Sequence, residues 1–161
     1  MKKAPQGHSL HSAFTMIELI FVIVVLGILS AVALPKFTGT KDMADVSKGR
    51  ADVAAIRSSI LTERQSQLIK GEYSYIPKLC AATTTEILFV DDGATPKRTL
   101  LTYGIVRGSA SGQWTQNGSC TSFKFKSGTT DVIFTYDNTA GTFSCLRDNT
   151  TYGDICKKLV D

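Results

Sequence analysis

The longest apolar run of the chain extends from residue 14 to residue 35 and contains a single charged side chain, Glu18. As a helix, a run of this length spans roughly 33 Å, which matches the hydrocarbon core of a bilayer. A core helix of a soluble domain would show a polar face, and this run has none. It therefore predicts a membrane-spanning helix, which Lys2 and Lys3 orient with the N-terminus in the cytoplasm.

A cleaved secretory signal peptide is the alternative interpretation of this run. Lys2 and Lys3 would supply its basic region, and the tripeptide Ala-Val-Ala at residues 31–33 imitates a cleavage site. However, the run is longer than the roughly 7–15 apolar residues usual in a signal peptide, and it has a carboxylate near its start. We therefore favour a membrane anchor over a Sec-exported soluble protein cleaved after Ala33.

Glu18 needs a partner in such a helix, because an acidic side chain at the centre of a membrane costs about 2.5–3.5 kcal/mol. No Lys or Arg lies within a helical turn or two on the same face. We therefore expect the partner to come from another chain or from a newly formed N-terminus.

The residues AFTMIE at positions 13–18, followed by a long apolar segment, resemble the class III signal of type IV pilins and type II secretion pseudopilins. The resemblance covers residues 1 to about 40, with a short basic leader and Pro35 within the apolar segment. In that family, a prepilin peptidase cuts before the Phe at the cytoplasmic face and methylates the new amine. The resemblance implies a cut between Ala13 and Phe14 and N-methylation of Phe14. Ala13 stands where the family usually has Gly.

The resemblance also supplies a partner for Glu18. Cleavage would leave an α-amine on Phe14, and such amines have a reference pKa of about 8. In a filament, Glu18 of one subunit would pair with the Phe14 amine of its neighbour, because a wrong register leaves both charges buried and unpaired. We therefore expect Glu18 to be an assembly residue, rather than a carboxylate that reaches to the lipid headgroups.

The sequence after Pro35 predicts an amphipathic continuation of the helix over residues 36–71. Charged and apolar side chains alternate at helical spacing, and Gly71 supplies a stop signal. Gly27 and Pro35 weaken the helix between its two parts, and the resemblance implies local melting there in an assembled filament. The apolar positions expected to pack on the following domain are Val46, Val53, Ile56, Ile60 and Leu68.

Residues 72–161 are expected to form a β-rich globular domain. Gly, Ser, Thr and Asn become abundant there, and the apolar period shifts toward two. Turn signals at residues 127–128 and 138–141 make the last three strands an antiparallel meander. The predicted strands cover residues 86–90, 99–106, 121–126, 130–136 and 142–146.

The alternation of aromatic and basic residues in one predicted strand indicates how this domain packs. Phe123 and Phe125 alternate with Lys124 and Lys126, so one face of the sheet packs on the helix and the other meets solvent. The expected fold is α+β and pilin-like, with a long N-terminal helix packed on a small antiparallel β-sheet.

All four cysteines of the chain, Cys80, Cys120, Cys145 and Cys156, lie in this domain. An even number of cysteines outside the cytoplasm predicts two disulfides, and three connectivities are possible. We favour Cys145–Cys156, which closes a C-terminal loop, with Cys80–Cys120 as the second bond. Pilins often carry such a C-terminal loop, and this is a weaker point of resemblance.

The sequence disfavours a zinc site and catalysis. It has no C-x-x-C motif, and its only histidines, His8 and His11, lie in the expected leader. The mature chain would therefore lack the base of a Ser-His-Asp or Cys-His site. No phosphate-binding loop, dinucleotide fingerprint or metalloprotease motif is present. We expect neither an enzyme nor a bound cofactor or metal.

Two acidic clusters are candidate calcium loops. One is the Asp-Asp-Gly sequence at residues 91–93, and the other contains Asp148, Asn149 and Asp154. Neither has the regular ligand spacing of a known calcium loop, and clusters of Asp, Asn and Gly are usually turns. We therefore interpret both clusters as turns.

The charge distribution disfavours nucleic acid as a partner. The formal net charge is +4, but residues 72–161 contain nine basic and nine acidic side chains. A neutral domain lacks the positive field that dominates nucleic-acid binding, although Lys124 and Lys126 offer a local patch. Trp114 and Tyr103 are candidate recognition aromatics, and a lone Trp in a small domain is more often part of the core.

The sequence thus predicts a structural subunit of a type IV pilus-like filament. The subunit would be anchored in the bacterial inner membrane, processed by prepilin peptidase, and assembled with copies of itself and other pilin subunits, with its globular domain in the periplasm. We expect a type II secretion pseudopilus. A DNA-uptake pseudopilus, a DNA-binding tip subunit and a surface pilus are the alternatives.

Overall fold

The computed structural model describes residues 14–82 and 86–161, without the side chains of residues 32–39. The chain divides into two compact units, Met1–Gly39 and Thr40–Asp161, which are treated separately. The expected leader, with Ala13 and its two lysines, lies outside the described residues.

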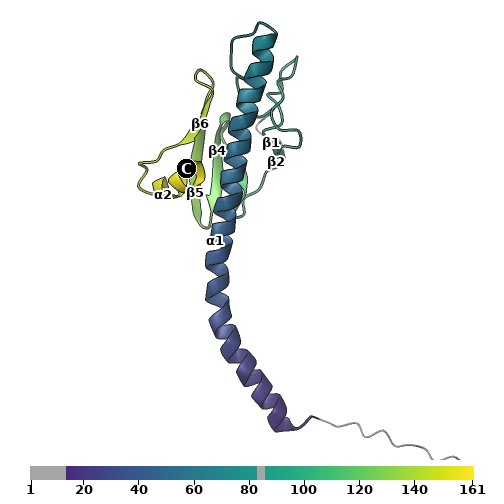
Figure 1. The fold of residues 1–161 in the computed structure, drawn as a ribbon, viewed down its shortest axis with the longest axis vertical. Helices are drawn as coiled ribbons and strands as arrows, with labels where there is room; N and C mark the ends of the chain where they lie inside the picture. Colours follow the sequence, from purple (N-terminus) through teal and green to yellow (C-terminus); the bar gives the residue numbers. More distant parts are fainter. Residues whose placement is uncertain (1–13, 83–85) are drawn as a thin grey trace, which may run out of the picture. The chain divides into compact units, whose positions relative to one another are not determined.

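Helix α1 (Met16–Ile69) contributes to both units (Figure 1). Within the described residues, no helix combines the length and apolar content that a membrane crossing requires, so the span expected over residues 14–35 is not shown. The predicted stop at Gly71 is confirmed, because α1 ends two residues earlier and Gly71 adopts a φ of +85°. The Glu72 N–H donates to the Gln67 carbonyl and the Gly71 N–H to the Leu68 carbonyl, which is a Schellman C-cap.

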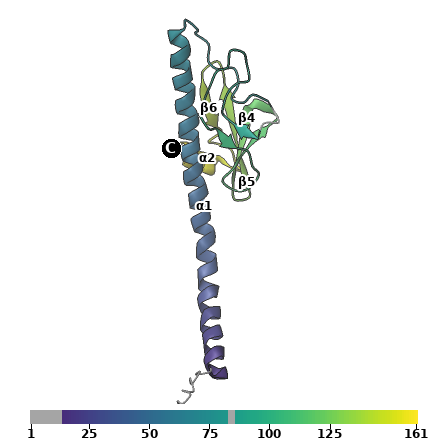
Figure 2. The same ribbon diagram turned by 90° about the vertical axis from the view of Figure 1, so that its right-hand side faces the viewer.

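The second unit is an α+β domain with helices and antiparallel sheets, which confirms the predicted α+β class. The pilin-like arrangement with a membrane-spanning first half of the helix stays a prediction. Its main sheet lies along the C-terminal part of α1, as both views of the ribbon show (Figures 1 and 2). The sheet is an antiparallel meander with the strand order β3-β4-β5-β6. Its strands are β3 (Trp114–Asn117), β4 (Ser119–Ser127), β5 (Thr130–Asp137) and β6 (Thr142–Cys145).

Two further elements complete this unit. A small antiparallel pair contains β1 (Ile87–Leu88) and β2 (Ile105–Val106). The chain ends in α2 (Gly153–Val160), whose Lys158 carbonyl accepts hydrogen bonds of 2.9 and 2.6 Å from the Arg50 guanidinium of α1.

The strand predictions have mixed outcomes. The three strands predicted for the meander correspond to β4, β5 and β6 and are confirmed within a few residues of their predicted ends. The predictions for residues 86–90 and 99–106 are wrong in extent, because only two residues of each are strand. A left-handed turn at Gly104, with a φ of +62°, interrupts the second of these segments. Strand β3 and helix α2 were not predicted.

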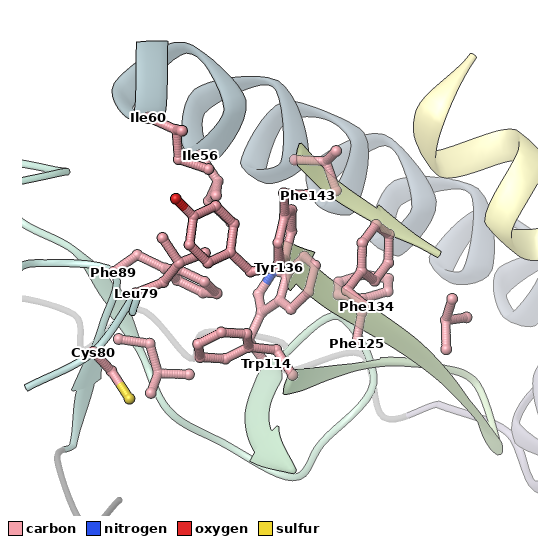
Figure 3. Close-up of a cluster of buried hydrophobic side chains, with 14 of the residues drawn as sticks. Ile56, Ile60, Leu79, Cys80, Phe89, Trp114, Phe125, Phe134, Tyr136 and Phe143 are labelled. Atoms are coloured by element: carbon pink, nitrogen blue, oxygen red, sulfur yellow. The ribbon is translucent and has the colours of Figure 1, made fainter. Parts of the chain in front are cut away.

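Aromatic rings fill the space between α1 and the sheet (Figure 3). Trp114 is completely buried at their centre, and its ring lies 5.1 Å from those of Phe125 and Phe134. Val53, Ile56 and Ile60 face this cluster from α1 as predicted. The prediction for the last apolar position of the stripe, Leu68, is wrong, because this side chain is 43% exposed.

Gly49 allows a close approach between α1 and the rest of the domain. A Cβ atom at this position would lie 2.5 Å from Cζ of Phe125 and 2.7 Å from Cδ2 of Leu159. Real Cβ atoms do not come this close to neighbouring carbon atoms, so the packing of α1 against both β4 and α2 depends on the absence of a side chain.

Candidate assembly segment

The first turn of α1 is closed by reciprocal bonds between Thr15 and Glu18. The Glu18 N–H donates to Oγ1 of Thr15 across 3.3 Å, and the Glu18 carboxylate accepts from the Thr15 N–H across 3.4 Å. The Thr15 hydroxyl lies 3.5 Å from the same carboxylate oxygen. This is the capping box of a T-x-x-E sequence, with Thr15 at the N-cap and Glu18 at the third helical position.

The cation expected from another chain or from a newly formed N-terminus stays a prediction, but Glu18 also has a hydrogen-bond partner within its own chain, which was not predicted from the sequence. The T-x-x-E spacing is visible in the sequence and could have shown it. A carboxylate in the first helical turn is also stabilised by the helix dipole. The side chain stays exposed, so its oxygens remain accessible to a cation.

Apart from Thr15, the side chains around Glu18 are apolar and exposed. Phe14, Met16 and Ile17 are between 76% and 81% exposed. The exposed apolar residues that follow are Leu19, Ile20, Phe21, Val22, Ile23, Val24, Val25, Leu26, Ile28 and Leu29. Fully burying one large aliphatic or aromatic side chain contributes about 1.5–3 kcal/mol, so this segment has a strong physical drive to associate with apolar surroundings.

The two predicted weak points of α1 are helical in the structure. The backbone is assigned to the helix at both Gly27 and Pro35. A Cβ atom at Gly27 would meet no atom within 4 Å beyond the adjacent backbone of its own helix, so packing does not require glycine there. The expected melting concerns an assembled filament and stays a prediction.

Two disulfides, Cys80–Cys120 and Cys145–Cys156, have the pairing favoured from the sequence. Their Cα atoms lie 5.1 Å and 5.9 Å apart, within the usual range for a disulfide. The second bond ties α2 to β6.

The first candidate calcium loop is held by its own carboxylates. Oδ1 of Asp91 accepts from the Gly93 N–H across 2.8 Å, and Oδ1 of Asp92 accepts from the N–H groups of Ala94 and Arg98. Lys97 lies 3.2 Å from the second oxygen of Asp91. These are the bonds of a turn, as expected.

The second candidate loop has the same character. Oδ1 of Asn149 accepts from the N–H groups of Thr151 and Tyr152, next to the start of α2. Asp154 lies 3.7 Å from the ammonium group of Lys157. Across residues 14–82 and 86–161, no group of three acidic, histidine or cysteine side chains is placed to hold a metal ion.

The candidate recognition residues do not gather at one site. Trp114 belongs to the core, whereas Tyr103 is 89% exposed. Lys124 lies 3.9 Å from Asp131 on the neighbouring strand, which offsets the local positive charge. These residues therefore do not form a single basic and aromatic surface, and the expectation that nucleic acid is not a partner stays a prediction.

Comparisons with known proteins identify relatives in two bacterial systems. Over 49 residues the chain is 39% identical to the type II secretion system core protein G of Aeromonas hydrophila, a segment that covers 30% of this chain and 34% of the relative. The same protein of Escherichia coli strain K12 is 34% identical over 47 residues, 29% of this chain and 32% of the relative. The type IV narrow pilus major component PilA5 of Thermus thermophilus is 48% identical over 46 residues, 29% of this chain and 40% of the relative.

The chain thus has homologues named as a type II secretion system core protein and as a type IV pilus component, and the resemblance found in the sequence is confirmed at this level. The matched segment spans about a third of the length of these relatives. No model of a protein family and no solved structure matches the chain.

Proposed function

We propose that this chain is a structural subunit of a type IV pilus-like filament, and in particular of a type II secretion pseudopilus. The observation that carries the proposal is the capped helix start, in which Glu18 stands alone among exposed apolar side chains. The similarity to secretion core protein G and to a type IV pilus component supports it.

In this proposal the chain has four parts. Residues 1–13 form a leader that prepilin peptidase removes between Ala13 and Phe14. Residues 14–35 anchor the subunit in the inner membrane and pack against neighbouring subunits in the filament. Residues 36–71 continue the helix, and residues 72–161 form a periplasmic domain stabilised by the two disulfides.

Glu18 would contribute to assembly through its charge. After cleavage and methylation, the Phe14 amine of a neighbouring subunit would be the cation that the exposed Glu18 carboxylate lacks. In surroundings of low dielectric constant the attraction between these groups favours one axial register, because other registers bury both charges unpaired.

The primary test is the mass and N-terminal sequence of the mature protein, produced in a host with an active prepilin peptidase. A chain that starts at Phe14 and carries one methyl group on its amine is the expected result. A chain that starts at Leu34 would replace the proposal with simple secretion. A chain that still begins at Met1 would indicate that residues 14–35 are a plain membrane anchor.

A further inference from the structure

Glu63 is a buried carboxyl that the proposed function does not use. It lies on α1 with a side chain that is 2% exposed. By distance and angle neither of its oxygens makes a hydrogen bond, although the Gln67 side chain is near enough to lower the pKa of the carboxyl. Buried polar groups in proteins nearly always have partners, so this one requires an explanation.

The strap, defined as residues 91–100, lies next to Glu63. Thr99 and Leu100 of the strap and Ser59 and Thr62 of α1 line, together with Glu63, a cavity of about 230 Å³. The strap also carries Asp92, which is 1% exposed and has one oxygen, Oδ2, without a hydrogen bond. A polar cavity of this size has room for water molecules, but both oxygens of Glu63 are buried, so they gain contact with that water only when the strap moves outward.

Arg98 of the strap is the nearest cation, but it is bound elsewhere. Its Nε atom lies 3.9 Å from Oε1 of Glu63, beyond hydrogen-bond distance. Its terminal nitrogens donate to the carbonyls of Ser74 and Tyr75 and to the Ser74 hydroxyl across 2.9–3.3 Å. Arg98 therefore holds the strap to the segment after α1 and leaves the Glu63 carboxyl without a direct hydrogen-bonded ion pair.

We propose that Glu63 is a proton-operated latch, which keeps the strap closed against α1 while its carboxyl is protonated and loosens the strap when the proton is lost. A neutral carboxyl tolerates a buried position without well-formed hydrogen bonds far better than a carboxylate does. An ionised Glu63 would repel Asp92, and it would gain hydration only if the strap moved away.

The electrostatic surroundings agree with this mechanism. Burial raises the pKa of Glu63 most, and the charge of Asp92 raises it further, whereas Gln67, Arg98 and Lys70 lower it. Two further titratable groups face this site, the Tyr136 phenol of β5 and Lys97 of the strap, which lines the same cavity as Glu63. Because the pKa is raised in the folded state, the closed strap is fully stable below the ordinary pKa of Glu and loses stability as the pH rises through the raised value.

Hydrogen exchange of the full chain in detergent, followed by mass spectrometry, tests this inference. The rates are compared at about pH 4.5 and pH 8 after correction for the intrinsic pH dependence of exchange. We expect amides 91–100 to lose protection several-fold more than the amides of β4 and β5 at the higher pH. Glu63→Gln, neutral at both values, should abolish this difference. The matched control, Glu72→Gln, replaces an exposed acid near the strap and should retain it.

Other outcomes would overturn the latch. Strap protection that is independent of pH, or that increases with pH because Arg98 closes on a charged Glu63, contradicts it. So does a Glu63→Gln variant that keeps the wild-type response. If that variant does not fold, carbon-13 titration of the wild-type Glu63 carboxyl decides the matter, since a midpoint no higher than those of exposed glutamates rejects the proposal.

Discussion

The indole Nε1 of Trp114 donates a hydrogen bond of 2.9 Å to the Asp52 carboxylate and thereby joins β3 to α1. Trp114 is completely buried, so its N–H group has little access to water as a substitute partner. Asp52 also lies 3.5 Å from the ammonium group of Lys48, one helical turn earlier. A charged acceptor at the edge of the aromatic cluster thus fixes the orientation of its central ring.

Asp52→Ala should destabilise the domain by about 1–3 kcal/mol, because it leaves the buried indole N–H without an acceptor. Urea unfolding of the full chain, followed by Trp114 fluorescence, measures this loss. Asp42→Ala is the matched control, since it removes an exposed acid from the same helix and should cost less than about 0.5 kcal/mol. Equal losses in the two variants would show that the hydrogen bond contributes nothing specific.

Gly49→Ala should lower the stability of the domain even though alanine is the better helix former. The gain in helix propensity is about 1 kcal/mol, whereas a methyl group forced against Phe125 and Leu159 typically costs about 1–3 kcal/mol. The midpoint of thermal unfolding measures the net effect. Gly27→Ala adds the same methyl group to α1 where no atom beyond the adjacent backbone of the helix lies within 4 Å, and it should not lower this midpoint.

Removing the disulfides by paired Cys→Ser substitutions should destabilise the domain to different extents. The bonds close loops with sequence separations of 11 residues for Cys145–Cys156 and 40 residues for Cys80–Cys120. Chain entropy predicts losses of about 3 and about 4 kcal/mol, respectively. Urea unfolding of the two double variants tests the order. A larger loss for the shorter loop would show that the packing of α2 contributes more than loop entropy does.

Tyr136 should ionise only in strongly alkaline solution. Burial, with smaller contributions from Glu63, Tyr75 and Asp137, raises the pKa of its phenol to about 12. The hydroxyl donates to the Ile76 carbonyl across 2.8 Å. Because this pKa is raised on folding, the associated stability is present below the ordinary pKa of Tyr and is lost as the pH rises through about 12. Ultraviolet titration should show a step near this pH that Tyr136→Phe removes.

Glu18→Gln should strongly reduce filament assembly in cells while leaving the subunit in the membrane fraction. Thr15→Val tests whether Glu18 acts only as a cap, because it removes the hydroxyl partner and leaves the carboxylate in place. If pairing with a neighbouring amine dominates, the sheared filament fraction should fall much further for Glu18→Gln than for Thr15→Val. Equal falls would restrict Glu18 to its capping role.

The meander could be predicted because its signals are local. In β4, Phe123 and Phe125 face the core between solvent-facing lysines, and turn residues separate β4 from β5 and β5 from β6. The lengths of β1 and β2 were overestimated. Between these strands, hydrogen bonds to the carboxylates of Asp91 and Asp92 and the left-handed turn at Gly104 shape the chain in place of strand pairing. Helix α2 was not predicted, because a helix of eight residues gives only a weak periodic pattern of apolar residues.

The buried acid was missed for a different reason. Val53, Ile56, Ile60, Glu63 and Gln67 follow one another at spacings of three and four, so helical periodicity alone places Glu63 on the core face. A stripe chosen from apolar residues alone, by contrast, continues to Leu68 and omits Glu63. A polar residue at helical spacing from core positions can therefore be buried, and a search for apolar residues alone does not find it.

The capping box has a consequence for how subunits would join and leave a filament. Its two bonds form within one chain, so the first turn of α1 is folded before any neighbour arrives. In the proposed filament, a neighbour's amine would meet a carboxylate that already accepts hydrogen bonds from Thr15 through one of its oxygens. Pairing would therefore gain less free energy than pairing with a bare carboxylate, which favours reversible growth over permanent association.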